Sequence, residues 1–356
     1  PDVIHCNDWQ TGLVPLMIKA RGEKDSFFKK ISTLMSVHNF AFQGNFDSRF
    51  LSTLECDAYT SEFDKFKVNG HYSFLKGGLV CADQVSTVSK NHAKETKTSD
   101  EFGFGFSKLL KSRGNDYTGI VNGIDDSLWD PEVDPFIHSQ YTIKELHIKK
   151  ENKKALYDRC HFDASLESPC LSVISRLADQ KGFDWLSQIF DDLMKKDLVF
   201  VLLGVGDVQY HQFFTKMQKQ YPAKVSVHLT FDDQLAHEII AGSDIFLMPS
   251  KFEPCGLTQL YSLKYGTVPV VNATGGLVDT VHSYDFETGK GNGFMMKEPN
   301  ENELLHQINL ALELYQDSKS WLKLMKSGMR EDFSWQSSAK KYVQLYGKCL
   351  TKRKDG

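Results

Sequence analysis

The chain has 356 residues, of which 41% are hydrophobic and 25% are charged, and its formal net charge is −4 at pH 7. These are values of a globular protein, and the length suits two domains better than one. A net negative charge argues against nucleic acid or an acidic membrane surface as the main partner. The sequence shows no signal peptide and no apolar run long enough to span a bilayer.

The first half of the chain alternates short apolar runs with helical segments. We predict strands at 3–4, 32–37, 82–89 and 120–121, and helices at 13–20 and 73–81. Asp8 and Trp9 follow the first strand, and His38 and Asn39 follow the second. Open parallel sheets bind ligands at the carboxyl ends of their strands, which makes these residues site candidates, although a lone histidine there is more often structural.

Several other stretches of the first half have weaker patterns. The run Lys76-Gly-Gly-Leu79 has the letters of a phosphate loop but lies within a helical segment, which favours close helix packing. Alternating Phe and Gly at 101–106 predict a loop with exposed or cleft-facing rings. We expect irregular surface structure at 51–71, a linker at 130–168 and, within it, a solvated Lys- and Glu-rich helix pair at 141–160.

The second half opens near Pro169 and repeats the strand–helix alternation. Predicted strands cover 171–174, 198–203, 225–228, 245–248 and 268–271, and predicted helices cover 183–194, 235–241, 257–266, 303–314, 320–329 and 337–350. Such alternation indicates two doubly wound α/β domains with a cleft between them.

Two loops of the second half carry candidate ligand-binding groups. Arg176 and Lys181 share the loop after one strand, where an Arg fork and a Lys point charge suit a diphosphate. Glu253 lies in the loop after the strand 245–248, and a helix begins directly behind that loop. Unpaired N–H groups and the helix dipole favour an anion at such a helix start. Surface charge and an ordinary α/β loop are the alternative explanations.

Together these pieces resemble the bacterial glycogen synthase and plant starch synthase family, glycosyltransferase family five. The matching motifs are spread in order over nearly the whole chain. They are His5-Cys-Asn-Asp8-Trp9-Gln-Thr-Gly12, Val37-His38-Asn39, Thr87-Val-Ser89, Asn122-Gly-Ile-Asp125, Ser175-Arg176-Leu-Ala-Asp-Gln-Lys181-Gly182, Phe252-Glu253-Pro-Cys-Gly-Leu-Thr-Gln259 and Thr274-Gly-Gly-Leu-Val-Asp-Thr280.

The resemblance implies a GT-B fold, in which two Rossmann-like domains close over a nucleotide sugar. We expect an N-terminal domain at 1–165, a nucleotide-sugar domain at 166–330, and a C-terminal helix at 331–356 that packs back on the first domain. The implied reaction is transfer of glucose from ADP-glucose, with UDP-glucose as the alternative donor, to the non-reducing end of an α-1,4-glucan with retention of configuration. A non-catalytic glucan-binding relative and another retaining GT-B glycosyltransferase are the alternatives.

The resemblance also implies the site residues. Arg176 and Lys181 would neutralise the diphosphate, Glu253 would hold the donor glucose, and His38 would line the sugar. The implied donor-binding residues are Asp8, Trp9, Asn39, Asn122, Cys255, Gly256, Leu257, Thr258, Thr274, Gly275 and Gly276. Arg and Lys already supply positive charge, and no ligands occur at metal spacing, so we expect neither a metal nor a cofactor.

The chain departs from the family pattern in two places. Many retaining GT-B enzymes have a second glutamate eight residues after the first, where this chain has Tyr261. The N-terminal Lys-x-Gly-Gly-Leu loop of the family is absent, and the chain opens at Pro1 in what resembles the end of a strand. We therefore expect the first strands of domain one to be missing. Seven scattered cysteines indicate a reducing compartment, the cytoplasm or a plastid.

Overall fold

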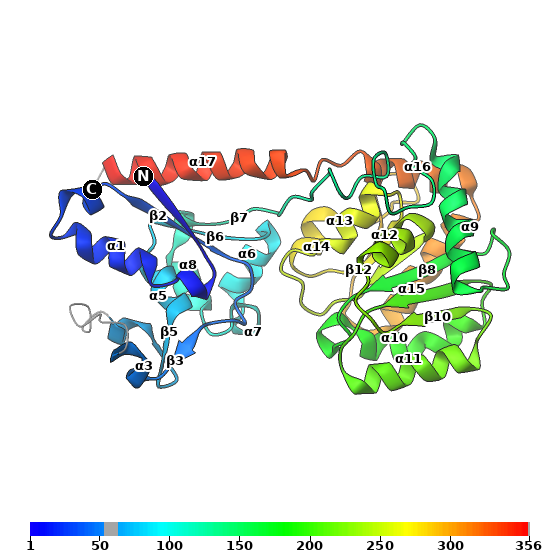
Figure 1. Ribbon diagram of the computed structural model, residues 1–356, viewed down its shortest axis with the longest axis horizontal. Coiled ribbons are helices and arrows are strands. Elements are labelled where there is room, and N and C mark those ends of the chain that lie inside the picture. The colour runs from blue at the N-terminus through cyan, green and yellow to red at the C-terminus, as the bar shows by residue number, and fades with distance from the viewer. Residues whose placement is uncertain (53–62, 355–356) are drawn as a thin grey trace. The chain divides into compact units, whose positions relative to one another are not determined.

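The computed structural model of the protein describes residues 1–52 and 63–354 (Figure 1). The chain forms two compact units, one from 1–122 with 335–356 and the other from 123–334. The first unit thus ends well before the predicted boundary at 165. The reason is that α9 (Lys149–Cys160) packs against α12 (Asp233–Gly242) of the second unit.

The first unit is built on a parallel sheet with the strand order β1-β2-β6-β7. A small antiparallel sheet, β3-β5-β4, accompanies it. The elements are β1 (Val3–Asn7), α1 (Val14–Gly22), α2 (Ser26–Lys29), β2 (Ser32–Val37), β3 (Asn45–Phe46), α3 (Ser48–Ser52), β4 (Lys67–Val68), β5 (His71–Ser73), α5 (Phe74–Cys81), β6 (Gln84–Thr87), α6 (Lys90–Thr98), α7 (Asp100–Gly103), α8 (Ser107–Ser112), β7 (Tyr117–Gly119) and α17 (Trp335–Lys354).

Most predicted elements of this unit are present, with two differences. The last strand is β7 at 117–119 rather than 120–121. The Phe- and Gly-rich stretch at 101–106 begins as α7, and Phe106 is buried rather than exposed. The Lys76-Gly-Gly-Leu79 run lies within α5, as predicted. Residues 53–62 of the stretch expected to be irregular lie outside the described residues.

The C-terminal helix α17 packs against β2 in the first unit. The Ser338 hydroxyl donates to the carbonyl of Val121 at 2.6 Å, and the Tyr346 hydroxyl lies 2.9 Å from His5 Nδ1. Leu345 is buried against Leu34 of the sheet. These contacts cover one face of the parallel sheet with a helix from the other end of the chain.

The second unit contains a six-stranded parallel sheet with the order β10-β9-β8-β11-β12-β13. In sequence order this is 3-2-1-4-5-6, the order of dinucleotide-binding folds. The elements are α9, β8 (Cys170–Ile174), α10 (Phe183–Met194), β9 (Val199–Leu203), α11 (Val208–Gln220), β10 (Val225–His228), α12, β11 (Ile245–Met248), α13 (Thr258–Lys264), β12 (Val268–Asn272), α14 (Gly275–Thr280), β13 (Phe294–Met296), α15 (Glu301–Tyr315) and α16 (Ser318–Met329).

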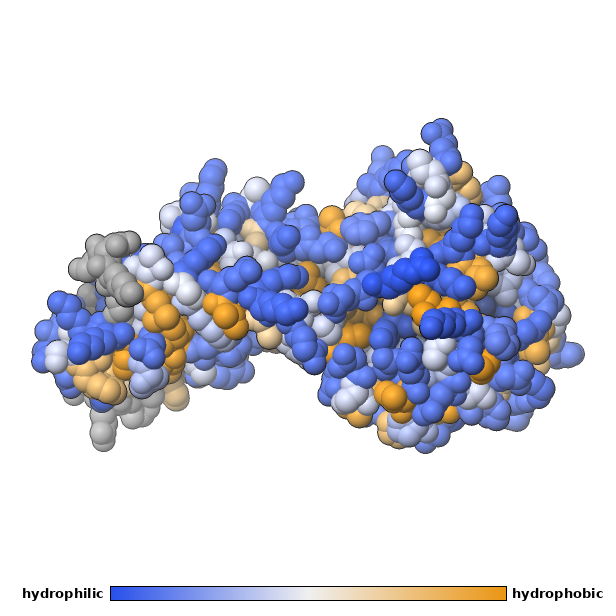
Figure 2. Space-filling view, turned by 90° about the horizontal axis from the view of Figure 1, so that it is seen from above, coloured by the Kyte–Doolittle hydropathy of each residue, from blue (hydrophilic) through white to orange (hydrophobic). Residues whose placement is uncertain are grey.

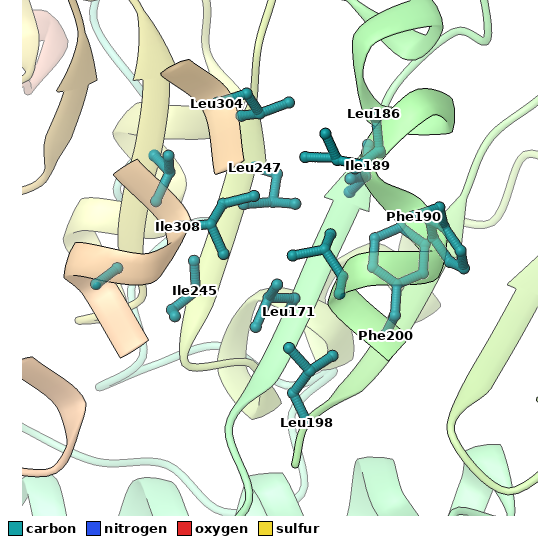
Figure 3. Close-up of a cluster of buried hydrophobic side chains, with 14 of the residues drawn as sticks. Leu171, Leu186, Ile189, Phe190, Leu198, Phe200, Ile245, Leu247, Leu304 and Ile308 are labelled. Atoms are coloured by element: carbon teal, nitrogen blue, oxygen red, sulfur yellow. The ribbon is translucent and has the colours of Figure 1, made fainter. Parts of the chain in front are cut away.

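Alternation along the strands of this sheet gives each face its own core. Leu171, Ile245 and Leu247 point to the face that α10 and α15 cover, where they join a large apolar cluster (Figure 3). Cys170 and Phe246 point to the opposite face and belong to other clusters. Because both faces are covered, the strands are continuous apolar runs in the sequence, which is why their bounds could be predicted.

The lysine-rich stretch at 141–160 is not the solvated helix pair that its composition suggested. It contains a short 3₁₀ turn and α9, in which Lys149 and Lys153 are buried. Lys149 Nζ donates to the carbonyls of Ile240 and Ala241 at the end of α12, at 3.2 and 2.7 Å. Lys153 Nζ forms an ion pair with Asp244 at 2.7 Å. Both ammonium groups therefore have buried partners, as buried charges require.

Hydrophilic residues predominate on the face of the molecule in Figure 2, and the hydrophobic residues there form small groups. The helices in the described part of the chain include none with the length and apolarity needed to cross a bilayer.

Candidate functional site

The site is positioned by the point at which the strand order of the second unit reverses. Chain connections from β8 and β11, which are neighbours in the sheet, lead away to opposite sides. The loops after these strands therefore leave room at their carboxyl ends. A cavity of about 370 Å³ lies there, lined by Val173, Ile174, Ser175, Arg176, Lys181, Leu247, Met248, Pro249, Ser250, Glu253, Gly256, Leu257 and Thr258.

An ion pair occupies the wall of this cavity. Lys181 Nζ donates to Glu253 Oε2 at 2.5 Å, and the Ser250 hydroxyl donates to the same oxygen at 3.1 Å. Glu253 is only 8% exposed. Both bonds fall on Oε2, and among the described residues none donates to Oε1. A nearly buried carboxylate thus keeps one oxygen for a ligand hydroxyl, while the ammonium group has further N–H donors for an anion.

Gln180 joins the two loops that carry this pair, and the sequence analysis had not singled it out. Its Nε2 donates to the carbonyl of Phe252 at 2.9 Å, and its own carbonyl accepts from the N–H of Lys251 at 2.8 Å. Its Oε1 accepts a long bond of 3.4 Å from Arg176. Gln180 thereby fixes the spacing between the loop of Arg176 and the loop of Glu253.

Gly182 allows the same two loops to approach closely. Its φ is +76°, and a Cβ at this position would lie 2.0 Å from the carbonyl oxygen of Pro249. We expect Gly182→Ala to lower the free energy of unfolding by about 3 kcal/mol, because backbone strain and a clash with rigid backbone combine. Chemical denaturation measures this loss. Gly289→Ala is the matched control: its φ is +66°, and the nearest described atom to an added Cβ is Tyr284 Oη, at 3.7 Å. A loss of about 1 kcal/mol is expected for the control, and equal losses in both variants would contradict the argument.

The second glycine motif supports the Glu253 loop from behind and does not line the cavity. A Cβ on Gly275 would lie 1.9 Å from the carbonyl oxygen of Glu253, and the Gly276 N–H donates to that oxygen at 3.0 Å. Cys255 is buried, as is Thr274, whose hydroxyl has no hydrogen-bond partner among the described residues. Gly275 and Gly276 therefore shape the Glu253 loop through its backbone, and none of these four predicted donor-binding residues is among those that line the cavity.

A second cavity of about 410 Å³ adjoins the first and is more apolar. The two share Ile174, Ser175, Arg176 and Thr258. The remaining lining residues are Trp129, Leu203, Gly204, Val205, Thr230, Phe231, Asp232, Asp233, Ala236, Ile240 and Tyr261. Phe231 is 84% exposed, which is unusual for a phenylalanine ring.

Sequence reasoning missed the residues that distinguish this second cavity. Trp129 lies in the range 1–165 that the sequence assigns to the first domain, directly before the predicted linker at 130–168. The sequence marks Tyr261 only as an aromatic residue of the predicted helix at 257–266 and as the residue at the position of a second glutamate. No local pattern marks Phe231, because it lies in a short connection between β10 and α12.

In the first unit, Asp8 and His38 follow β1 and β2, which are paired in the sheet. The Asp8 carboxylate accepts the backbone N–H of His38 at 2.8 Å. Nε2 of the histidine lies 3.2 Å from Asn7 Oδ1. Asn39 Oδ1 accepts the N–H of Ala41 at 2.9 Å, which fixes the next turn. Asp8 thus positions the histidine through its backbone.

Trp9 and Asn122 are the other predicted donor-binding residues of the first unit. Trp9 packs against Gly44, where a Cβ would lie 2.4 Å from its indole ring, and it contacts the ring of Phe46. Asn122 Oδ1 is buried and has no hydrogen-bond partner among the described residues. The described residues also contain no cluster of three or more side chains suited to a metal ion.

Comparisons with known proteins cover both units. The starch synthase catalytic domain family matches residues 1–112, and the family described as glycosyl transferases group 1 matches residues 162–326. The glycogen synthase of Thermosipho africanus is 44% identical over 354 residues, which are 99% of this chain and 73% of that protein. The glycogen synthase of Clostridium perfringens is 45% identical over 347 residues, 97% of this chain and 72% of that protein.

Solved structures agree with these sequence relatives. The catalytic domain of starch synthase IV from Arabidopsis thaliana, bound to ADP and acarbose, has a TM-score of 0.89 at 33% identity and covers 99% of this chain and 73% of its own. Sucrose-phosphate synthase from Thermosynechococcus elongatus has a TM-score of 0.61 at 15% identity over 98% of this chain and 74% of its own, which shows the fold alone. The chain belongs to the glycogen and starch synthase family of GT-B glycosyltransferases, as the sequence motifs predicted.

Proposed function

We propose that the protein transfers glucose from ADP-glucose to the non-reducing end of an α-1,4-glucan, with retention of configuration. The observation that carries the proposal is the Lys181–Glu253 pair in a cavity at the strand-order reversal, next to an apolar cavity. A phosphate-binding region beside an apolar one suits a nucleoside diphosphate sugar. The starch synthase IV structure that resembles this chain contains ADP and acarbose, which supports ADP as the nucleotide.

The diphosphate would lie against Arg176 and Lys181. Cleavage of the bond between sugar and phosphate places negative charge on the leaving group, and two cations that line the cavity would stabilise that charge. Gly256, Leu257 and Thr258 line the same cavity, and their backbone N–H groups would add hydrogen bonds to phosphate or sugar oxygens. We propose that the leaving phosphate also helps to deprotonate the acceptor hydroxyl.

Glu253 would hold the donor glucose through its Oε1. Lys181 and Ser250 both bond Oε2 and fix the carboxylate plane. A double-displacement mechanism would need a carboxylate free to attack the anomeric carbon. Glu253 instead serves as a hydrogen-bond acceptor that orients the sugar for departure and attack on one face.

The nucleoside would occupy the apolar cavity, with Phe231 as a stacking platform. An exposed ring at a cavity mouth offers a base a flat apolar face, and such stacking contributes about 1–3 kcal/mol per base. Arg176 lines both cavities and so lies where the diphosphate would join the nucleoside.

We expect Phe231→Ala to raise the KM for ADP-glucose about tenfold, because the stacking surface is removed. The turnover number and the stability should change little, since the ring is 84% exposed. Steady-state kinetics with varied donor measures the effect. Phe286→Ala, which removes another exposed ring, is the control and should resemble the wild type. An unchanged donor KM in Phe231→Ala would contradict the placement of the base in this cavity.

We propose that His38, Asn39, Asp8, Trp9 and Asn122 of the first unit also act on the donor sugar, as the family resemblance implies. The reaction would take place in the cytoplasm or a plastid. All six cysteines of the described part are free thiols, which is typical of a reducing compartment.

One assay tests the proposed donor. Glucose incorporation into glycogen is measured with ADP-glucose and with UDP-glucose, using the full-length protein at equal donor concentrations. The proposal predicts a kcat/KM for ADP-glucose well above that for UDP-glucose. Equal or reversed values would contradict the ADP assignment.

A further inference from the structure

Two rings of a three-ring aromatic stack line the apolar cavity. The Trp129 indole lies between two rings, with centroid distances of 3.6 Å to His237 and 3.9 Å to Tyr261. The interplanar angles are 14° and 8°, so the three rings are nearly parallel. Trp129 and Tyr261 line the cavity, whereas His237 is buried behind them.

A buried carboxylate holds the inner end of this stack. Asp134 is fully buried, and its Oδ2 lies 2.7 Å from His237 Nδ1. The Tyr265 hydroxyl donates to the same oxygen at 2.5 Å, and the N–H of Phe136 donates to Oδ1 at 2.8 Å. Burial alone would raise the pKa of Asp134, but the hydrogen bond from His237 and then those from Tyr265 and Phe136 outweigh it and lower the pKa. Asp134 is therefore an ionised anchor.

The segment that contains Trp129 is held in place by a backbone hydrogen bond and by an ion pair of the next residue. The backbone N–H of Trp129 donates to the carbonyl of Asp125 at 2.8 Å. The next residue, Asp130, forms an ion pair with Lys264 of α13 at 2.7 Å. Tyr261 lies one turn earlier on α13. The indole is thus fixed relative to α13, the helix that begins directly after the loop of Glu253.

We propose that Asp134 and His237 are positioning residues that act through Trp129 and Tyr261 to hold the nucleoside wall of the donor site. Neither Asp134 nor His237 lines the cavity, so their influence on the nucleotide passes through the stacked rings. Where many retaining GT-B enzymes have a glutamate, this chain has Tyr261, and the stack gives that ring its fixed orientation. The inference rests on the proposed function, because it assumes that a nucleotide occupies the two cavities.

Two probes distinguish an effect on the nucleoside wall from an effect on the region of Arg176 and Lys181. On this proposal ADP would fill both cavities, whereas inorganic pyrophosphate would contact only the region of Arg176 and Lys181. Dissociation constants for both are measured by calorimetry on the full-length protein. We expect Trp129→Ala to weaken ADP binding about fivefold, as loss of a ring contact does, and to leave pyrophosphate binding unchanged.

His237→Phe tests the positioning role itself. This variant keeps a ring in the stack but removes the hydrogen bond to Asp134. We expect ADP binding about threefold weaker, an unchanged pyrophosphate affinity, and a raised donor KM at constant kcat. Trp129→Phe should restore most of the ADP affinity lost in Trp129→Ala, because it returns an aromatic ring to the stack. His138→Phe makes the same substitution at an exposed site nearby and should match the wild type.

Each result decides the question. Selective loss of ADP binding in Trp129→Ala and His237→Phe supports the inference. Equal loss of ADP and pyrophosphate binding would show that the stack only stabilises the fold. Unchanged binding of both would show that the stack does not affect the nucleotide. Either result would overturn this inference and leave the proposed function standing. A wild-type protein that binds neither probe would overturn the proposed function with it.

Discussion

Replacing Glu253 with alanine should reduce glucose incorporation into glycogen at least about 100-fold while the protein stays folded. The carboxylate is nearly buried in the cavity wall, and its Oε1 is the acceptor that we assign to the donor sugar. Loss of that acceptor leaves the glucose without orientation in the transition state. The measurement is kcat with saturating donor and glycogen, together with circular dichroism.

Two further variants sharpen this prediction. Ser250→Ala removes one hydrogen bond to Glu253 Oε2 and should cost far less activity, since the pair with Lys181 still fixes the carboxylate. Glu253→Gln keeps the shape of the side chain but not its charge, and we expect an intermediate loss. Near-normal activity of Glu253→Ala would refute the role of this residue.

Replacing Lys181 with glutamine should lower kcat/KM for the donor about 100-fold. The kcat/KM for glucan should fall less. Lys181 is the cation that faces the cavity beside Glu253, and an amide cannot neutralise a developing phosphate charge. Initial rates with ADP-glucose and glycogen varied separately distinguish the two substrates.

The control for this variant is Lys251→Gln. Lys251 lies in the Glu253 loop but pairs with Asp184 at 2.6 Å and does not line the cavity. Its loss should change kcat/KM less than about threefold, as exposed ion pairs contribute little. An unchanged donor dependence in Lys181→Gln, or an equal effect in both variants, would count against the diphosphate role.

The two large effects should not be additive. Lys181 and Glu253 are in direct contact, so each single variant also removes the partner of the other side chain. We expect the double variant to lose less activity than the product of the two single losses. Strict multiplication would indicate that the residues act independently on the donor.

The strands of the second sheet could be predicted from the sequence because they are buried on both faces and therefore form continuous apolar runs. The bounds of β10 and β11 and of α10 agree with the predicted ranges, since apolar runs and the helical period are local signals. The loops after β8 and β11 could be identified as ligand loops because parallel strands bring their carboxyl ends together.

What the sequence could not show depends on contacts between distant residues. The charges of Lys149 and Lys153 predict solvent exposure, but both side chains are buried because they have partners on α12 and at Asp244. Residues 123–165 were placed in the wrong unit for the same reason. Trp129 belongs to this stretch, and only the fold reveals its ring beside Tyr261, 132 positions later in the chain.

A structure of the protein with ADP bound would show where the nucleotide lies. We expect the diphosphate against Arg176 and Lys181, and the base in the apolar cavity beside Phe231. A nucleotide bound elsewhere, or with its phosphates away from Lys181 and Glu253, would contradict this placement.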